Sequence, residues 1–500
     1  MNSWWVPSLS VTATDTTAVL IGVAVFIIVR WLCRRPANLP PGPLALPLVG
    51  SLPSLLFYSG APHEIFHRLS QRYGPVVNID LIFGRRVVVL HGYDVIKDAF
   101  RHYPQLNGRP SLSVFEKVLK GGVGVVGASG DLWRAQRRIT LHFMRDFGLN
   151  KPHFEDRIST EARHLLEAIR AHRGCPFNPS HILSSALANV ICLVVFGSRY
   201  EYTDPRFVEL LRAIYRNLEL MGGATGAILF MPYSHLLAKF VPVVRECLDN
   251  TQYVCDFSRA ALEDHREDFD PGNLRDFMDV IIREMTCTKS GVTVNDLHGT
   301  TADLFAAGTE TSAVTLQWAL LYMVACPQVQ ARVQQELDRV VGRSRFPRLS
   351  DRNRLPYAVA TLQEVQRIGN IIPLGVPHEA SGDVTFRQHH IPKGTLVLPN
   401  LWALGTDPTL WPEPHVFNPD RFLDEHHEVL KPDELLPFCI GRRSCVGEQL
   451  AKMELFLFFT HLLHRFTFEK PEGSPALSFR GVGGISLSPQ PFEICAIPRR

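Results

Sequence analysis

The 500-residue chain has little net charge, few cysteines and no acceptor site for N-glycosylation. Lys plus Arg number 52 and Asp plus Glu number 49, which leaves a formal net charge of +3. A dedicated nucleic-acid binder usually shows a much larger basic excess. Ten cysteines are too few for a disulfide scaffold, and no Asn-X-Ser/Thr with X other than Pro occurs. A reducing compartment is therefore expected, where a special cysteine serves as a metal ligand or a nucleophile.

A single long apolar run stands near the N-terminus, where residues 18–29 read AVLIGVAVFIIV. Twelve helical residues span about 18 Å, short of the roughly 30 Å hydrocarbon core, and flanking apolar residues bring the run near spanning length. Positive charge follows it at Arg30, Arg34 and Arg35, which favours an anchor that leaves the rest of the chain in the cytosol. A cleaved signal peptide would need basic residues before the run, and none is there. We therefore predict a signal anchor at residues 1–32.

After the anchor comes a dense cluster of prolines, including Pro36 and the stretch Pro40-Pro41-Gly42-Pro43. Proline at this density cannot form the interior of a helix and behaves as a stiff, extended spacer. We predict a proline-rich hinge at residues 33–60 and a single catalytic body at residues 61–500.

The body is predicted to be mainly α with a small β-rich portion. Helical periodicity predicts helices at residues 131–146, 155–172, 181–196, 206–220, 238–266, 274–287, 296–325, 327–341, 356–369 and 446–465. Short strand-like runs stand at 75–81, 86–90, 384–386, 396–399 and 492–497. Strands and helices do not alternate regularly, so a doubly wound sheet is not expected. Repeats and low-complexity stretches are also missing after residue 60.

Two short motifs match known chemistry but lack its context. His63-Glu64-Ile65-Phe66-His67 fits H-E-x-x-H, yet a catalytic zinc needs a third protein ligand and no suitable residue follows nearby. Residues 122–127 fit G-x-G-x-x-G, yet neither a preceding strand nor a βαβ unit surrounds them. We interpret the first as a surface helix and the second as a flexible loop.

The strongest chemical signal is the segment FCIGRRSCVG at residues 438–447, which has the pattern F-x-x-G-x-R-x-C-x-G. Cys445 stands at a loop-to-helix junction, where free N–H groups and the helix dipole favour a thiolate. Gly441 permits a tight turn, and Gly447 permits a flat ligand to approach the backbone. Arg443 can pair with a carboxylate of that ligand, and Phe438 can shield the sulfur from water. The alternative interpretation is a buried structural cysteine.

This segment resembles the haem-binding loop of the cytochrome P450 family. The resemblance extends over nearly the whole chain and implies the cytochrome P450 fold, with haem b as the cofactor. It implies that the thiolate of Cys445 is the proximal iron ligand. It also implies that further residues hold the haem carboxylates, namely Arg109, Trp133, Arg137 and His378 beside Arg443.

A second stretch, AGTETS at residues 307–312, lies within a long apolar helix. An acid and an alcohol side by side in such a helix are costly to bury without a role. Glu310 and Thr311 resemble the family's acid–alcohol pair, which delivers protons at the oxygen-binding side, and Gly308 lets a ligand approach the helix backbone. Thr311 bonding back to a carbonyl one turn earlier is the alternative.

A third group is Glu364 and Arg367, which an E-x-x-R spacing places on one helical face. Arg421, in the segment FNPDRF, resembles the arginine that completes a buried charge network in the family. That network would lock the loop that presents Cys445, and losing one partner would leave a buried charge without compensation. An ordinary exposed ion pair is the alternative.

The resemblance implies a microsomal monooxygenase of the animal family-2 group, on the endoplasmic reticulum membrane with its catalytic domain facing the cytosol. Electrons would come from NADPH–cytochrome P450 reductase, with cytochrome b5 as a further donor. Nucleic acid is not an expected partner. Two other interpretations stay open: an isomerase or dehydratase that uses peroxides, and a non-catalytic haem-binding protein.

The substrate is expected to be lipophilic, because the pocket positions implied by the resemblance are apolar. These are Phe115, Phe305, Ala307, Ile372, Val376 and Ile485. A long-chain fatty acid is the favoured substrate, and a vitamin D or steroid molecule or a xenobiotic is the alternative, since apolar pockets discriminate weakly. The family usually has His where this chain has Gly405, a departure that puts the subfamily in doubt.

Overall fold

The computed structural model describes residues 20–23, 25–26, 38–146, 152–222, 226, 228–229, 231, 233–287 and 291–499. Most of the predicted anchor at residues 1–32, and the start of the predicted hinge, lie outside these described residues. Within them, no helix combines the length and the apolar character needed to cross a membrane. The anchor therefore stays a prediction.

The described residues form a mainly helical body with several small sheets, which confirms the predicted class. The helices are α2 (Leu52–Leu55), α3 (Pro62–Tyr73), α4 (Tyr93–His102), α5 (Ser113–Val118), α6 (Gly130–Asp146), α7 (Pro152–Ala171), α8 (Ser180–Val195), α9 (Pro205–Leu220), α11 (Pro242–Arg266), α12 (Phe277–Cys287), α13 (Val294–Ala325), α14 (Pro327–Val340), α15 (Pro356–Gly369), α16 (Leu401–Gly405) and α17 (Glu448–Arg465). The strands are β1 (Val76–Asp80), β2 (Arg86–Leu90), β3 (His378–Glu379), β4 (Val384–Phe386), β5 (His389–Ile391), β6 (Leu396–Pro399), β7 (Phe466–Glu469), β8 (Gly481–Gly483), β9 (Leu487–Pro489) and β10 (Cys495–Pro498).

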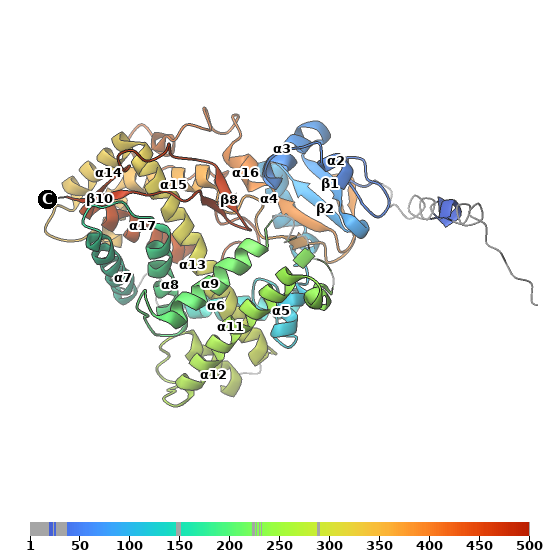
Figure 1. The fold of residues 1–500 in the computed structure, drawn as a ribbon, viewed down its shortest axis with the longest axis horizontal. Helices are drawn as coiled ribbons and strands as arrows, with labels where there is room; N and C mark the ends of the chain where they lie inside the picture. The colour runs from blue at the N-terminus through green and yellow to red at the C-terminus, as the bar shows by residue number, and fades with distance from the viewer. Residues whose placement is uncertain are drawn as a thin grey trace, which may run out of the picture.

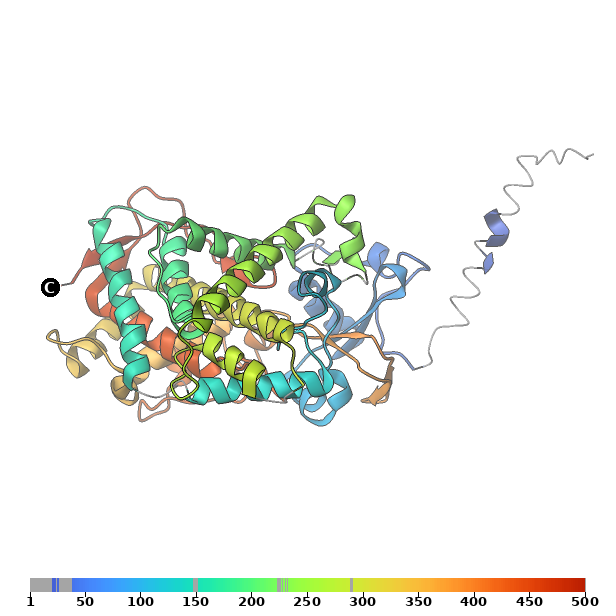
Figure 2. The same ribbon diagram turned by 90° about the horizontal axis from the view of Figure 1, so that it is seen from below.

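Helix α13 runs through the middle of the body, with α8, α9 and α11 beside it (Figures 1 and 2). It begins with a capping box in which the Thr293 hydroxyl accepts from the Asp296 N–H and the Asp296 carboxylate accepts from the Thr293 N–H. Most of its residues after the first turn are buried, because it is apolar on nearly all faces and packs against neighbours on several sides. This helix is therefore the fixed element around which the other parts of the body are placed.

The largest sheet has the strand order β1-β2-β6-β3 and lies toward the N-terminal end of the body (Figure 1). Strands β1 and β2 are antiparallel, and β2 pairs in parallel with β6 from far along the chain. The part of the predicted hinge that is described packs onto this sheet: the Asn78 N–H donates to Pro41 O, and the Ser51 N–H donates to Asp80 O. The described hinge residues that make these bonds therefore pack as part of the body.

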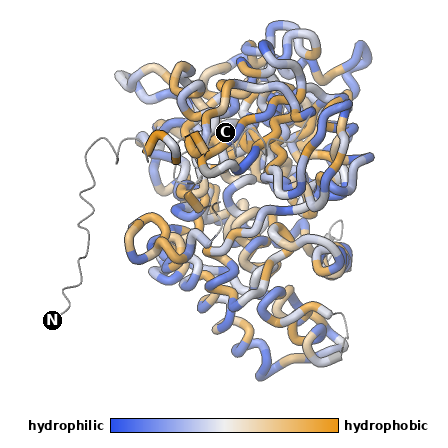
Figure 3. Tube along the Cα trace, turned by 90° about the vertical axis from the view of Figure 1, so that its right-hand side faces the viewer, coloured by the Kyte–Doolittle hydropathy of each residue, from blue (hydrophilic) through white to orange (hydrophobic). Residues whose placement is uncertain are grey.

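The main hydrophobic core gathers residues from α7, α8, α13, α14, α15 and α17. The hydropathy of the residues agrees with the position of this core. Apolar stretches run through the interior, and polar stretches form many of the outer loops (Figure 3). Smaller clusters fill the space on the two faces of the large sheet.

Several predicted boundaries were wrong by a few residues, and each difference has a local cause. The helix predicted at 238–266 begins at Pro242, because proline fits the first turn of a helix and not its interior. The helix predicted at 274–287 begins at Phe277, because Asp276 caps it: the Asp276 carboxylate accepts a hydrogen bond from the Asp279 N–H. The strands β3, β5, β7, β8 and β9 were not predicted, since two to four residues carry little periodicity.

Candidate functional site

Cys445 stands at the end of a tightly folded loop, three residues before α17 begins at Glu448. The Cys445 N–H donates to Phe438 O at 3.1 Å and closes the loop. Gly441 has φ +87°, and a Cβ there would lie 2.5 Å from Phe100 O, so this position requires glycine. Burial raises the pKa of the Cys445 thiol, and a hydrogen bond from the Gly447 N–H lowers it. A metal cation at the sulfur would supply the positive charge that stabilises a thiolate at this cavity wall.

The sulfur of Cys445 opens into the large central cavity of the molecule. The opposite wall comes from α13, so a flat ligand bound to the sulfur would lie between α17 and α13. The cavity brings together most of the predicted site residues, namely Arg109, Trp133, Arg137, Ala307, Gly308, Thr311, Ile372, Val376, His378, Phe438, Arg443, Cys445 and Gly447.

Three arginines gather at one edge of this cavity. Burial, together with repulsion from Arg109 and Arg137, lowers the pKa of Arg443 to about 9. Burial likewise lowers the pKa of Arg109 to about 10, while Cys439 and Asp303 raise it. So many guanidinium groups close together favour an anionic ligand with more than one negative charge.

Each of these arginines is held by the protein main chain. The guanidinium of Arg443 donates to Asn107 O at 3.0 Å and to Ala128 O at 2.6 Å, and it stacks on the Trp133 ring at 4.1 Å. The Arg137 guanidinium donates to Ser444 O at 2.9 Å. Bonds to carbonyls fix the side chains without neutralising their charge. The residues present therefore fit haem b, with a thiol for the iron and fixed cations for the two carboxylates.

His378 completes this edge. Its Nδ1 lies 3.0 Å from Leu106 O, and its ring stacks on Phe100 with centroids 4.1 Å apart. Burial lowers the pKa of His378 well below its usual value, and the charges of Arg109 and Arg443 act in the same direction. His378 is thus neutral around pH 7; its Nδ1–H donates to the Leu106 carbonyl, and the ring adds no charge to this edge.

The acid and the alcohol predicted on α13 point in different directions. Thr311 lines the cavity, and its hydroxyl donates to Ala307 O at 2.7 Å, which is the back-bond considered as the alternative. Glu310 does not line the cavity and instead accepts a hydrogen bond from Ser486 at 2.5 Å. Burial raises the pKa of Glu310 to about 7. Its carboxyl group must therefore reorient before it can face the space beside Thr311.

Gly308 also lines the cavity, but the tight packing at this position comes from another helix. A Cβ at Gly308 would lie 2.5 Å from Cδ1 of Ile191 on α8. The missing side chain therefore allows α8 and α13 to approach each other, a reason that the sequence pattern did not reveal.

Three of the six predicted pocket residues lie away from the cavity. Phe305 is 1% exposed and packs in the core against Phe196, with ring centroids 5.7 Å apart. Phe115 packs in a separate cluster with Leu220. Ile485 lies in the turn between β8 and β9, where its N–H donates to Leu218 O.

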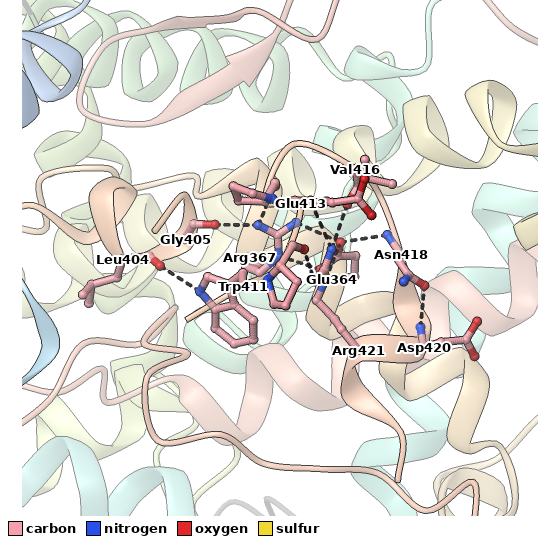
Figure 4. Close-up of polar contacts among 12 residues, drawn as sticks. Glu364, Arg367, Leu404, Gly405, Trp411, Glu413, Val416, Asn418, Asp420 and Arg421 are labelled. Carbon is pink, nitrogen blue, oxygen red and sulfur yellow. Dashed lines mark hydrogen bonds and ion pairs between the residues drawn. The ribbon is translucent and has the colours of Figure 1, made fainter. Parts of the chain in front are cut away.

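Glu364, Arg367 and Arg421 form a buried charge network (Figure 4). Arg367 Nε and Nη2 donate to the two oxygens of Glu364 at 2.7 and 2.8 Å, and Arg421 Nε donates to Oε1 at 3.1 Å. The Asn418 N–H adds a fourth bond to this carboxylate at 2.9 Å. The same network reaches Gly405, because Arg367 Nη1 donates to its carbonyl.

The unusual glycine at position 405 lies directly against α15. A Cβ there would lie 2.7 Å from the carbonyl oxygen of Arg367, so the backbone of this chain as it stands leaves no room for a side chain. The departure at this position is therefore a local packing feature beside the charge network.

Two aspartates on α13 organise the glycine-rich loop that the sequence showed without explaining. The Val123 N–H donates to Asp296 at 2.9 Å, and the Val126 N–H donates to Asp303 at 2.7 Å. A Cβ at Gly124 would lie 2.5 Å from the backbone of α13. The glycines therefore serve close packing on α13. The glycine motif in the sequence indicated the loop, but nothing in the sequence indicated that Asp296 and Asp303 hold it.

His63 and His67 lie on α3 and pack against the Trp402 ring, with centroids 5.1 and 5.9 Å away. Among the described residues, only His265, Asp276 and Asp279 place three metal-ligating atoms within 4.8 Å of one another. In that cluster, Arg275 already binds the Asp279 carboxylate. The first motif does form a helix, as interpreted, but His63 is buried and not at the surface.

Comparison with known proteins gives a consistent result. The family model described as Cytochrome P450 matches residues 40–496. Cytochrome P450 2J5 of Mus musculus is 40% identical over 97% of this chain and 96% of its own length. Cytochrome P450 2J2 of Homo sapiens is 40% identical over 96% of both chains. Cytochrome P450 2U1 of Rattus norvegicus is 36% identical over 97% of this chain and 96% of its own.

Proposed function

The chain belongs to the cytochrome P450 family of haem-binding monooxygenases, and from this we propose that it hydroxylates a lipophilic molecule, with a long-chain fatty acid as the favoured substrate. The family establishes that it is an oxidoreductase and that its cofactor is haem b. The substrate, the electron donors, the location and the role of each residue are parts of the proposal.

Cys445, Phe438 and the arginine cluster would hold the cofactor. The haem supplies the redox chemistry that inserts an oxygen atom of O2 into a C–H bond. Cys445 would provide the iron ligand, and Phe438 would keep water from the sulfur. Arg109, Arg137 and Arg443, with Trp133, would bind the carboxylates at the cavity edge, and His378 would line the same edge. Hydrogen bonding at the sulfur by the Gly447 N–H would tune the ligand.

Thr311 and Glu310 would supply protons on the α13 side of the cavity. Thr311 presents its hydroxyl there, and Glu310 has a pKa of about 7 because of its burial. A group with such a pKa can both bind and release a proton near neutral pH.

The observation that carries the proposal is the single cavity that has Cys445 on one wall, Thr311 on the other and three arginines at its edge. Cys445→Ser should abolish the thiolate spectrum of the reduced carbon monoxide complex. Cys439→Ser is the matched control, because Cys439 also lines the cavity and belongs to the same loop. A thiolate spectrum retained in Cys445→Ser would refute the ligand assignment.

The preference for a lipophilic substrate follows from the apolar walls beside Thr311, which include Leu304, Ile372 and Val376. Spectral titration of the purified protein with fatty acids, secosteroids and drugs, followed by identification of the products, tests this. A fatty acid that binds and is hydroxylated with NADPH and reductase supports the proposal. Turnover of a peroxide without NADPH would indicate an isomerase or dehydratase instead.

The location and the partners depend on the anchor predicted at residues 1–32. We expect the endoplasmic reticulum membrane, with the body in the cytosol, NADPH–cytochrome P450 reductase as electron donor and cytochrome b5 as a further donor. Deleting residues 1–32 should release a folded, haem-loaded body from washed microsomes. Membrane binding as tight as that of the full chain would show that the body itself holds the protein there.

A further inference from the structure

The carboxyl group of Glu310 is held on the far side of α13 by a hairpin from the C-terminal part of the chain. Ser486, in the turn between β8 and β9, donates to Glu310 Oε1 at 2.5 Å. Glu310 is 7% exposed and Ser486 is 4% exposed, so water does not compete freely for this bond. The neighbouring Thr311 faces the cavity. Whatever moves Ser486 will therefore change where the acid lies relative to the alcohol.

The side of the hairpin next to α13 is fixed by two further hydrogen bonds. The Leu487 N–H donates to Ile371 O at 2.7 Å, and Trp318 Nε1 on α13 donates to Leu487 O at 2.8 Å. These bonds place residue 487 firmly relative to α13. Ser486 lies directly before this fixed point, and the rest of the turn extends from there toward α9.

The other side of the turn lies directly against the end of α9. The Ile485 N–H donates to Leu218 O at 3.2 Å. A Cβ at Gly484 would lie 2.2 Å from Leu218 O, and a Cβ at Gly222 would lie 2.4 Å from the Cα of Gly484. Two backbones that touch without side chains between them transmit a displacement directly, because no flexible group can absorb it.

Helix α9 also approaches Glu310 through a side chain. The hydroxyl of the partly buried Tyr215 faces Ser184 of α8 and lies close enough to Glu310 to feel its charge. The acid thus has Ser486 from the turn and Tyr215 from α9 near it. Tyr215 is the titratable side chain of this group besides Glu310 itself.

We propose that Ser486 is a positioning residue for Glu310, and that the β8–β9 turn couples the position of α9 to the orientation of this acid beside Thr311. A displacement of the end of α9 shifts Gly484 and Ile485, loosens the bond from Ser486 and frees the carboxyl group to turn toward the cavity. This inference rests on the proposed role of Glu310 and Thr311 in proton delivery.

The electrostatics of the contact provide a readout that does not depend on turnover. Burial raises the pKa of Glu310, and the hydrogen bond from Ser486 lowers it, because a donor favours the charged form. Without that donor, the carboxyl group should hold its proton to higher pH. Its protonated C=O stretch in the infrared spectrum, assigned by its loss in Glu310→Gln, reports this directly in the resting, haem-loaded protein.

Ser486→Ala should raise the pH midpoint of this band by about one unit, a tenfold change in proton affinity. Ser486→Thr keeps a hydroxyl and should restore the midpoint. Ser488→Ala, two residues along the same hairpin, is the matched control and should leave the midpoint unchanged. A midpoint that stays unchanged in Ser486→Ala, or moves equally in Ser488→Ala, would overturn the positioning role.

Gly484→Ala tests the coupling to α9 with Ser486 intact. Its added Cβ should force the turn and α9 apart and shift the same band, whereas Gly382→Ala is a control in which the added Cβ meets nothing within 4 Å. A Gly484→Ala protein with altered substrate affinity and an unchanged Glu310 band would overturn the coupling.

Glu310→Gln separates this inference from the proposed function. If Glu310→Gln left the product per NADPH unchanged while Ser486→Ala still shifted the band, proton delivery by Glu310 would be wrong and the positioning contact would be right.

Discussion

Replacing Glu364 by glutamine should destabilise the protein far more than breaking an exposed ion pair. Glu364 and the Arg367 side chain are fully buried, and Arg421 is nearly so. The carboxylate accepts four hydrogen bonds, three of them on Oε1. An amide turns an N–H group toward these donors and leaves two buried guanidinium charges without a counter-charge. Removing one partner of a buried pair costs about 3–5 kcal/mol.

That cost is a large share of the roughly 5–15 kcal/mol by which folded domains are stable. The measurement is the urea midpoint of the purified, haem-loaded protein, followed by tryptophan fluorescence, to which the adjacent Trp411 contributes. Asp420→Asn is the matched control, because its pair with Arg332 spans 2.8 Å but both side chains are 42–49% exposed. An exposed pair contributes about 0–1 kcal/mol. Equal urea midpoints for Glu364→Gln and Asp420→Asn would refute the view that burial makes this network more stabilising than an exposed ion pair.

Three further predictions concern α13 and the end of α11. Thr311→Ala should release more hydrogen peroxide per NADPH with folding unchanged, and a peroxide yield equal to that of the parent would contradict proton delivery at this residue. Gly308→Ala should lower stability by about 1–3 kcal/mol through overpacking, because its Cβ meets Ile191 at 2.5 Å; combining it with Ile191→Val should recover most of the urea midpoint. The bond to Asp276 raises the pKa of His265, so its contribution to stability should be fully present below about pH 6.5 and lost as pH rises through the raised pKa. His265→Gln should remove that part of the pH dependence of the melting temperature, and an unchanged profile would show that the pair does not titrate.

The periodic helices were predictable because long amphipathic or apolar segments repeat every 3.6 residues, as 294–325 and 356–369 do. Their ends were less predictable, since Pro242 and the Asp276 cap act through single residues. Short strands such as β8 and β9 have no periodicity to detect, and they exist because tertiary contacts hold them.

In the candidate site, too, some features could be predicted from the sequence and others could not. Cys445, Arg443 and Gly441 could be recognised together, because ten contiguous residues fix their spacing and so their chemistry. The direction of a side chain on α13 could not, because Glu310 and Thr311 are adjacent in sequence and yet about 100° apart around a helix. Phe305 illustrates this point, since Phe196 at the end of α8, and not its own position near Ala307, decides where it packs.

The sequence by itself determined that a thiol stands before a helix and that an acid, an alcohol and several arginines recur at characteristic spacings, because covalent order fixes local geometry. Only the tertiary structure decided that three arginines meet at one cavity edge, that Ile191 makes position 308 require glycine, and that a C-terminal turn reaches Glu310 from 176 residues away. These are contacts between segments distant in the chain, and packing sets them through the mutual exclusion of atoms, which no local pattern encodes.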